Sequence, residues 1–208
     1  KVREVPPAQA AGRGAGEVEL RPRPRLRTDG WVLITGGTGE LGALVAQHLV
    51  EVHGVRRLVL ASRSGLGARG ASELRERLRA LGAEVRIESC DVSERRSVQE
   101  LVGRIREEGP LRGVIHCAGK LDDGMLESQT PEGLSAVLGA KADGAWYLHE
   151  ATASEEVDEF VLFSSLAGTL GAMGQSNYAA ANGFIDGLAG YRRKQGIRSQ
   201  SLAWGLWE

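Results

Sequence analysis

The feature that most constrains this chain is a regular alternation, after residue 30, of short runs of Val, Ile and Leu with longer amphipathic stretches. The short runs predict strands, and apolar residues at helical spacing predict helices. Strands and helices that alternate along a chain indicate a parallel sheet with right-handed crossovers. We therefore expect an α/β fold, a doubly wound parallel sheet with helices on both faces. The predicted strands are 31–35, 57–61, 84–89, 112–117, 159–164 and 200–204, and the predicted helices are 41–53, 71–81, 93–107, 131–153 and 178–195.

Composition excludes several classes of function. The 208 residues carry a net charge of -1, with basic residues spread among acidic ones, so no footprint for nucleic acid or a membrane surface is present. No apolar run approaches the roughly 20 residues that span a bilayer. Cys90 and Cys117 follow no metal-binding spacing and are expected to be reduced, buried side chains. We expect a cytoplasmic protein without a metal.

The first 30 residues differ from the rest, because they hold four of the six prolines and the alternating arginines of RPRPRLR. Such composition is typical of a linker or an edge strand. A basic arm that binds a partner is the alternative. We expect residues 1–30 to connect an upstream domain to residues 31–208.

A glycine-rich loop, TGGTGELG, follows the first predicted strand and opens a helix. Its Gly37-x-Gly39-x-x-Gly42 spacing is typical of dinucleotide sites, in which a pyrophosphate lies at the N-terminus of the helix. Gly37 would allow the tight turn, Gly39 the approach of a pyrophosphate, and Gly42 close packing of helix and sheet. A turn needed only for packing is the alternative. The predicted cofactor contacts here are Thr35, Gly36, Gly37, Thr38, Gly39, Leu41 and Gly42.

The ends of the next strands indicate which dinucleotide binds. The second strand ends in Ser62 and Arg63, where an NAD site usually has a carboxylate. Arg63 can pair with a 2′-phosphate, so NADPH is favoured. The alternative is that Arg63 is a surface arginine that binds no ligand. Asp91, followed by Val92, borders the adenine or caps the next helix. Ala118 and Gly119 are small enough for backbone to lie against the cofactor.

Ser165 and Tyr178 are the predicted catalytic pair. Reduction of a carbonyl needs a proton donor, which Tyr178 provides, and a second donor that polarises the oxygen, which Ser165 provides. A nearby cation is also needed to make the phenol more acidic. Residue 182, one helical turn after Tyr178, is Asn rather than Lys, so the cation must come from elsewhere. Lys141, on the neighbouring predicted helix, is the candidate.

These motifs together resemble one known family. TGGTGELG, SRSG, HCAG, LDDG, KADG, SSLAG, GQSNYAAAN and SLAWGLW are similar in order and spacing to the catalytic half of a ketoreductase domain from a modular polyketide synthase. That family belongs to the short-chain dehydrogenase/reductase superfamily, with a Rossmann-like fold. The resemblance implies that Lys141 is the catalytic lysine and Asn182 the tetrad asparagine, and that Lys141 and Tyr178 also touch the cofactor. It implies reduction by NADPH of a β-ketoacyl group carried on an acyl carrier protein by a phosphopantetheine thioester.

Two further features resemble the B-type ketoreductases, which make a D-configured 3-hydroxyl. Leu121-Asp122-Asp123 matches the LDD signature, and Leu170 stands where an A-type domain has tryptophan. Ala180 stands where the epimerising subgroup has proline, which implies subtype B1. Asp122 and Asp123 would order their loop or guide the pantetheine arm. Without the resemblance, an Asp-Gly turn explains the same residues.

The resemblance also implies partners. We expect a structural ketoreductase subdomain upstream, other polyketide synthase domains, and a substrate lid truncated at the C-terminus. Two other functions fit the same sequence: a catalytically silent scaffold that binds NADPH, and a free-standing short-chain ketone reductase. Loss of Ser165, Tyr178 or Lys141 would indicate the scaffold, and a YxxxK motif would indicate the free-standing enzyme. The chain has neither feature.

Overall fold

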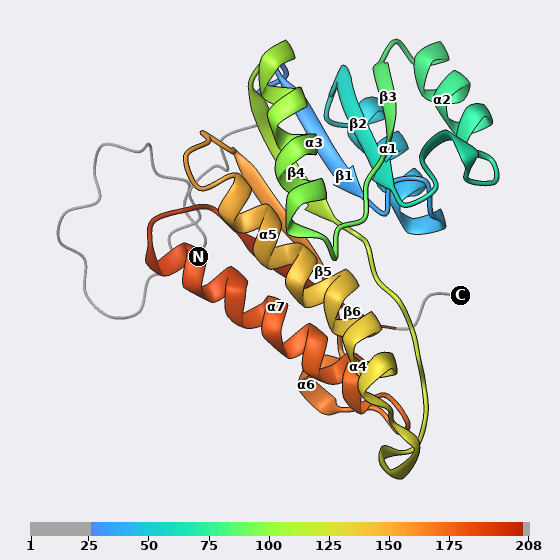
Figure 1. Ribbon diagram of the computed structural model, residues 1–208. Helices are drawn as coiled ribbons and strands as arrows, with labels where there is room; N and C mark the ends of the chain where they lie inside the picture. The colour runs from blue at the N-terminus through green and yellow to red at the C-terminus, as the bar shows by residue number, and fades with distance from the viewer. Residues whose placement is uncertain (1–25, 206–208) are drawn as a thin grey trace, which may run out of the picture.

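A parallel sheet forms the centre of the computed structural model, which describes residues 26–205. Within these residues the sheet has six strands in the order β3-β2-β1-β4-β5-β6, with helices on both faces (Figure 1). The predicted doubly wound α/β fold is therefore confirmed. The strands are β1 (Trp31–Thr35), β2 (Arg57–Ser62), β3 (Glu84–Ser89), β4 (Leu111–His116), β5 (Glu159–Ser165) and β6 (Gln200–Trp204).

The helices lie where the sequence predicts them, with different ends. The helix predicted at 178–195 begins two residues earlier, and the one predicted at 93–107 begins two residues later. A short helix before Tyr178 was not predicted. The helices are α1 (Glu40–Glu51), α2 (Ala71–Ala80), α3 (Arg95–Glu108), α4 (Pro131–Leu138), α5 (Gly144–Ala151), α6 (Ala167–Leu170) and α7 (Ser176–Lys194), with short 3-10 turns η1 (Gly65–Gly67) and η2 (Leu126–Ser128).

The long helix predicted at 131–153 is one helical segment with a change of geometry in its middle. Between α4 and α5 the backbone forms a π-helical section, η3 (Gly139–Asp143). The prediction of a continuous helix missed this section, because hydrophobic periodicity does not distinguish a π turn from an α turn. Such single π sections often occur at functional sites, and η3 contains Lys141.

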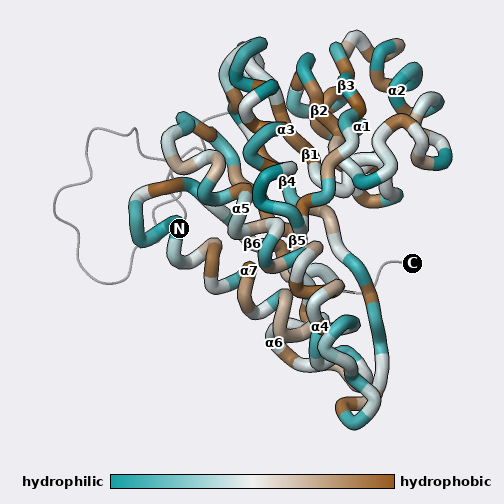
Figure 2. Tube along the Cα trace, viewed as in Figure 1, coloured by the Kyte–Doolittle hydropathy of each residue, from teal (hydrophilic) through white to brown (hydrophobic). Residues whose placement is uncertain are grey.

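Two hydrophobic layers hold the helices against the sheet. Side chains of α3, α5 and α7 pack on one face around Leu33 and Phe160, while α1 and α2 pack on the other around Ile34 and Leu60. Neighbouring residues of one strand therefore belong to opposite layers, as the two-residue period of a strand requires. Figure 2 shows brown, hydrophobic residues in the strands and an alternation of hydrophobic and hydrophilic residues along the helices. Both faces of the central strands are thus buried.

The segment before the first strand is described only from residue 26. Leu26 packs against the layer formed with α1 and α2. The Arg27 guanidinium pairs with Asp158, at 2.8 Å, and with Glu156, at 3.3 Å. Residues 26–30 form no strand. Residues 1–25, on which most of the linker prediction falls, lie outside the described residues.

None of the helices within residues 26–205 is both long enough and apolar enough to cross a bilayer. The same residues bring together no group of three or more His, Cys, Asp or Glu side chains that could hold a metal ion.

The start of α4 gives a direct test of the helix signals in the sequence. Thr130 Oγ1 accepts a hydrogen bond from the Gly133 backbone N–H at 3.1 Å, and Pro131 is the first helical residue. A hydroxyl residue before a proline is a sequence signal for a helix start, and this contact confirms that signal at Thr130. Thr130→Ala should lower the free energy of unfolding by about 1 kcal/mol, because one N–H of the first turn loses its acceptor. Thr130→Ser keeps the acceptor and should stay close to wild type in urea denaturation. Equal stability of the Ala and Ser variants would contradict the cap.

Candidate active site

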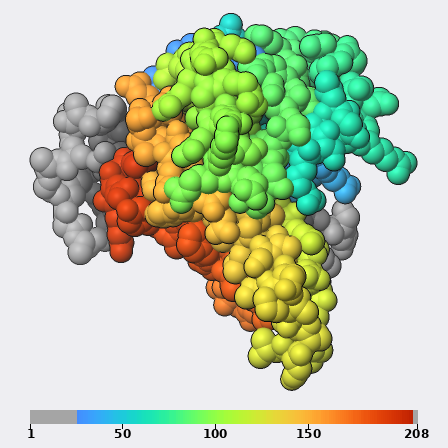
Figure 3. All heavy atoms as spheres, viewed as in Figure 1, coloured from blue at the N-terminus to red at the C-terminus, as the bar shows by residue number. Residues whose placement is uncertain are grey.

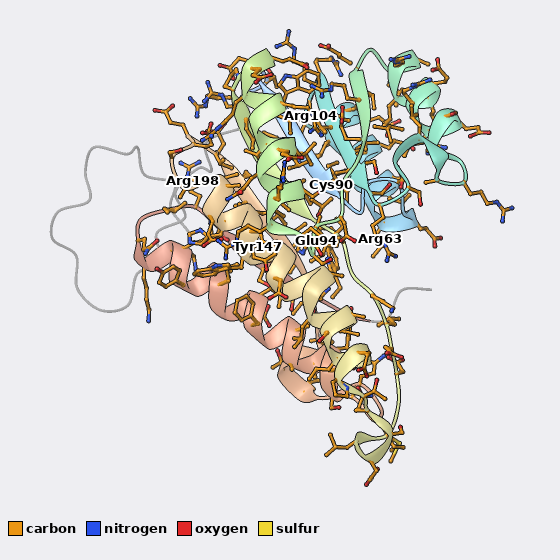
Figure 4. All side chains as sticks on the ribbon, viewed as in Figure 1. Arg63, Cys90, Glu94, Arg104, Tyr147 and Arg198 are labelled. Atoms are coloured by element: carbon orange, nitrogen blue, oxygen red, sulfur yellow. The ribbon has the colours of Figure 1, made fainter. Side chains whose placement is uncertain are left out.

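A cleft lies at the carboxyl ends of the strands, where the chain order of the sheet reverses. β1 connects through α1 to β2 on one side, while β4 lies on its other side. Doubly wound sheets bind ligands at this switch point. The cleft encloses about 460 Å³, and Arg63 lies at this end of the sheet, after β2 (Figure 4).

Nine of the predicted contact residues line this cleft, and ten other residues complete its wall. The predicted ones are Gly36, Thr38, Gly39, Ser62, Arg63, Asp91, Val92, Ala118 and Gly119. The additional ones are Ala61, Ser64, Ala68, Cys90, Ser93, Cys117, Lys120, Ser135, Ala136 and Ala140. Thr35, Gly37, Leu41, Gly42, Lys141 and Tyr178 are not part of the lining. Leu41 instead lines an apolar groove with Leu202 and Trp204.

The glycine loop adopts a shape that side chains would prevent. Gly36 has a φ of 67°, and a Cβ there would lie 2.8 Å from the Ala118 nitrogen. The tight turn is therefore at Gly36 rather than at Gly37, the position that spacing alone indicated. A Cβ on Gly42 would lie 2.3 Å from the Gly36 carbonyl oxygen, so Gly42 lets α1 pack on the loop itself.

The loop leaves the N-terminus of α1 suitable for an anion. The helix begins after Gly39, and no side chain caps it there. Free N–H groups and the helix dipole favour a phosphate at such an end. The residues present therefore fit a dinucleotide whose pyrophosphate lies on α1.

Asp91 borders the cleft but does not cap the helix that follows it. Its Oδ1 accepts hydrogen bonds from the Ser93 backbone N–H, at 3.0 Å, and from the Ser93 hydroxyl, at 2.7 Å. The N-cap of α3 is Glu94, which makes no side-chain cap. The capping alternative is therefore wrong. The contact with Ser93 instead holds the loop after β3 in place.

Lys141 is buried at the joint between α4 and α5. Its ammonium donates a hydrogen bond to the Phe163 carbonyl oxygen at 2.7 Å and lies 5.1 Å from the centroid of the Tyr178 ring. A Cβ on Gly119 would lie 3.8 Å from Nζ, so the ammonium also borders the wall of the cleft. The structure thus brings together Lys141 and Tyr178, which lie on two different elements and are 37 residues apart in the sequence.

Burial weakens the charge of Lys141. Loss of water lowers the pKa of the ammonium from 10.5 to about 8, while the neighbouring Cys117 and Asp186 side chains oppose the shift. Burial, together with the positive charge of Lys141, also lowers the pKa of His116 from 6.5 to about 4. At neutral pH the site therefore holds a lysine cation beside a neutral histidine.

Ser165 and Asn182 lie on the elements that border this lysine. Ser165 is the last residue of β5, and its hydroxyl oxygen accepts the Ala167 backbone N–H at 3.2 Å. Asn182 is fully buried on α7, and its Nδ2 donates to the Tyr178 carbonyl oxygen at 2.8 Å. Asn182 thus supports the turn of α7 that carries Tyr178.

The loop with Leu121-Asp122-Asp123 docks on the residues just before Tyr178. Asn177 Nδ2 donates to the Asp122 carbonyl oxygen at 2.7 Å, and Gln175 Nε2 donates to an Asp123 carboxylate oxygen at 2.9 Å. Leu121 is exposed. The chain around residues 120–135 projects from the main body (Figure 3). The two aspartates therefore join this projection to the start of α7.

Sequence reasoning missed three residues that hold this site together. His116 was predicted only as the end of a strand, and Asn177 and Gln175 had no predicted role. His116 bonds both the Thr35 hydroxyl and the Lys141 carbonyl. A histidine at the carboxyl end of a buried strand was the available signal for His116. No local pattern marks Asn177 or Gln175, because their partners lie more than 50 residues away.

Fold and cleft together indicate a class: a doubly wound protein with a dinucleotide cleft at the carboxyl ends of its strands, which Lys141 borders from behind the wall. The family model described as KR domain matches residues 30–208. The chain therefore belongs to the ketoreductase domain family of polyketide synthases, whose members are oxidoreductases that act on a keto group.

Similar proteins agree with this family. The chain is 54% identical over 196 residues to polyketide synthase GfsB of Streptomyces halstedii, covering 94% of the chain and 4% of that protein. It is 51% identical over 210 residues to the spectinabilin polyketide synthase system protein NorB of Streptomyces orinoci, covering 99% of the chain and 10% of that protein. The chain thus spans only a small part of these relatives.

Solved structures show the same likeness. One described as A-type ketoreductases from a modular polyketide synthase superposes with a TM-score of 0.84 at 45% identity, covering 89% of this chain and 39% of the other. The first ketoreductase of the tylosin polyketide synthase superposes with a TM-score of 0.81 at 47% identity, covering 86% of this chain and 39% of the other. The Rossmann-like fold is therefore that of these ketoreductases.

Burial of Lys141 has a measurable cost in stability. Between pH 8 and 10.5 the unfolded lysine keeps a proton that the folded one has lost, so the contribution of Lys141 to stability rises with pH through this window. Lys141→Met should therefore be more stable than wild type at neutral pH, by up to about 3 kcal/mol. The difference should close as pH approaches 10.5. Denaturant unfolding at several pH values measures it.

Exposed Lys194 on α7 provides the control. Lys194→Met makes the same substitution at a side chain that lies in solvent, so it should change the free energy of unfolding by much less at neutral pH. A constant difference between Lys141→Met and wild type from pH 7 to 10.5 would show that the Lys141 pKa is not lowered.

Proposed function

We propose that this chain reduces the β-keto group of an acyl chain, held as a phosphopantetheine thioester on an acyl carrier protein, to a D-configured 3-hydroxyl with NADPH. The observation that carries the proposal is the 5.1 Å between the Lys141 ammonium and the Tyr178 ring, in a chain whose residue 182 is Asn. The cation that such a tyrosine needs comes from the joint between α4 and α5.

Each residue of the group has a task that its contacts support. When bound in the cleft, NADPH supplies a hydride to the keto carbon. Tyr178 donates its phenolic proton to the keto oxygen, and the Lys141 ammonium stabilises the negative charge left on the phenol. The Ser165 oxygen already accepts from Ala167 N–H, so its own O–H is free to donate to the same keto oxygen. Asn182 holds the backbone of Tyr178.

NADPH is proposed over NADH because of the end of β2. Arg63 is exposed at the wall of the cleft, and Ser62 stands where an acidic residue would bind a ribose hydroxyl. A guanidinium pairs with a 2′-phosphate through two parallel N–H groups, whereas a carboxylate would repel it. The residues that border the predicted adenosine therefore suit a phosphate.

The D configuration is proposed from the loop that carries Asp122 and Asp123. Through Asn177 and Gln175 this loop is fixed to the residues directly before Tyr178. It is thus placed to limit the side from which an acyl arm reaches the phenol. Exposed Leu170, on α6, has no large ring that would favour entry of the acyl arm from the other side. These residues support B-type stereochemistry, and Ala180, in the place where the epimerising subgroup has proline, supports subtype B1.

The partners are proposed from the size and identity of the relatives. The chain spans 4% of GfsB and 10% of NorB, which leaves most of each polyketide synthase for other domains. An acyl carrier protein would deliver the substrate, and a structural subdomain upstream of residue 31 would support the catalytic one. We place the domain in the cytoplasm.

Removing the proton donor tests the reaction. Tyr178→Phe should lower kcat by about a hundred-fold to ten-thousand-fold, because the ring stays in place while the O–H is lost. The assay follows NADPH oxidation with a β-ketoacyl pantetheine thioester. Tyr191→Phe, on the exposed face of the same helix, should keep wild-type activity.

Binding of NADPH separates the proposed enzyme from the alternatives. Tyr178→Phe should bind NADPH with nearly the wild-type Kd, measured by nicotinamide fluorescence. Equal kcat for wild type and Tyr178→Phe would contradict the catalytic assignment. A wild-type protein that binds NADPH and reduces no ketone would be a scaffold, and one that reduces only free small ketones would be a free-standing type of reductase.

Cofactor choice depends on Arg63. Arg63→Ala should weaken binding of NADPH by about ten-fold to a hundred-fold, the value of one hydrogen-bonded charge pair, and leave the Kd for NADH nearly unchanged. Arg69→Ala changes an exposed arginine that does not line the cleft, so it should bind both as wild type does. An equal loss for both cofactors in Arg63→Ala would contradict contact with a 2′-phosphate.

Chiral analysis of the product tests the stereochemical proposal. Wild type should give the D-3-hydroxyl in large excess. Gln175→Ala removes the contact with Asp123 and should lower this excess, because the loop is then less fixed against α7. An L-configured product from wild type would refute the B-type assignment.

A further inference from the structure

His116 joins three parts of the active site through one buried ring. It is the last residue of β4 and lies beside Thr35, the last residue of β1. The Thr35 hydroxyl and His116 Nδ1 are 2.7 Å apart, and His116 Nε2 is 3.0 Å from the Lys141 carbonyl oxygen. The ring is 1% exposed. It therefore ties the sheet to the helical joint that carries the lysine.

Chemistry fixes the proton on this ring. A carbonyl oxygen only accepts, so Nε2 must carry the proton that it donates to Lys141. Burial and the lysine charge keep the pKa of His116 near 4, so Nδ1 is unprotonated at neutral pH and accepts the Thr35 hydroxyl. The ring is thus a neutral, oriented donor, and it adds no second charge beside the ammonium.

The segment that receives this bond is the π-helical section. The Lys141 carbonyl also accepts the Gly144 backbone N–H, and a Cβ on Gly144 would lie 3.2 Å from His116 Cε1. The His116 ring therefore packs against the same part of the helix to which it donates its hydrogen bond. At the other end of the same residue, Nζ bonds the Phe163 carbonyl. Lys141 is held at its backbone by β4 and at its ammonium by β5.

We propose that His116 is a positioning residue for Lys141: its Nε2–H holds the Lys141 carbonyl, and so sets how far the ammonium reaches toward Phe163 and Tyr178. His116 touches neither the keto group nor, through these contacts, the phenol. Its effect on catalysis rests on the proposed function, in which Lys141 is the cation beside Tyr178. The hydrogen bond itself can be tested without that function.

Two amide substitutions at His116 distinguish the roles of the two ring nitrogens. In His116→Gln the amide nitrogen reaches about as far as Nε2 and keeps a donor for the Lys141 carbonyl. In His116→Asn the shorter amide reaches about as far as Nδ1 and keeps only the contact with Thr35. Both are neutral and polar, and because Asn leaves the larger cavity, the Tm of each variant is measured to separate loss of packing from loss of the donor.

Kinetics of the full chain test the catalytic effect. With a β-ketoacyl pantetheine thioester and NADPH, His116→Gln should keep kcat within a few-fold of wild type. His116→Asn should lose about a hundred-fold in kcat, the effect of a displacement of about 1 Å, with much smaller changes in KM and in the Kd for NADPH. Equal losses in both variants, in proportion to their fall in Tm, or no loss in His116→Asn, would overturn the proposal.

An NMR measurement tests the hydrogen bond in the absence of substrate and cofactor. The chain has four lysines, so lysine labelled with ¹³C at its carbonyl gives few signals, and Lys141 is assigned by labelling Ala142 with ¹⁵N. The Lys141 carbonyl shift should be kept in His116→Gln and should move in His116→Asn. An unchanged shift in both would overturn the proposal. If wild type reduces no thioester, the proposed function fails, and the carbonyl shift still decides the role of His116.

Discussion

The burial of the Lys141 ammonium is the constraint on which the arrangement of this site depends. A charge 4% exposed needs partners, since an unpaired buried cation costs several kcal/mol. The Phe163 carbonyl takes one N–H, the Tyr178 ring lies beside the charge, and His116 holds the backbone behind it. Each partner comes from a different element, so the charge is satisfied only when β4, β5, α7 and the α4–α5 joint are all in place.

The parallel sheet is what brings these elements to one end of the molecule. All the carboxyl ends of its strands lie at the same edge, so Thr35, His116 and Ser165, each the last residue of a strand, gather there. Right-handed crossovers then place α5 and α7 on the same face, next to each other. The lysine and the tyrosine meet because two helices pack, and local spacing plays no part in their contact. This explains how residue 182 can be Asn in a chain that keeps a cation beside its tyrosine.

The sequence predicted those parts that depend on local patterns. The strands, the cap at Thr130 and the glycine loop follow from periodicity, from a hydroxyl before a proline, and from backbone crowding that excludes Cβ atoms. It did not predict the π-helical section, because this section spans only Gly139–Asp143, too few residues for a change of period to show in the apolar pattern. It also placed the tight turn at Gly37, because spacing counts glycines and does not show which one has a positive φ.

Contacts between distant segments could not be predicted from the sequence, for a different reason. His116 bonds a residue 25 positions away, and Asp122 bonds one 55 positions away. Nothing in either local pattern identifies the partner. The sequence made Lys141 only a candidate partner of Tyr178, on a neighbouring predicted helix, and resemblance to a family favoured it. Packing of α7 against the α4–α5 joint supplies the physical reason.

The most direct test of this account is the titration of Lys141 itself. With lysine labelled at its ε-carbon, the Lys141 signal is the one lost in Lys141→Met, and exposed Lys120 and Lys194 provide reference signals in the same sample. Lys141 should titrate with a pKa near 8, lowered by burial from the ordinary value of 10.5. A Lys141 signal that titrates at the ordinary value of 10.5 would contradict a buried cation held between Phe163 and Tyr178.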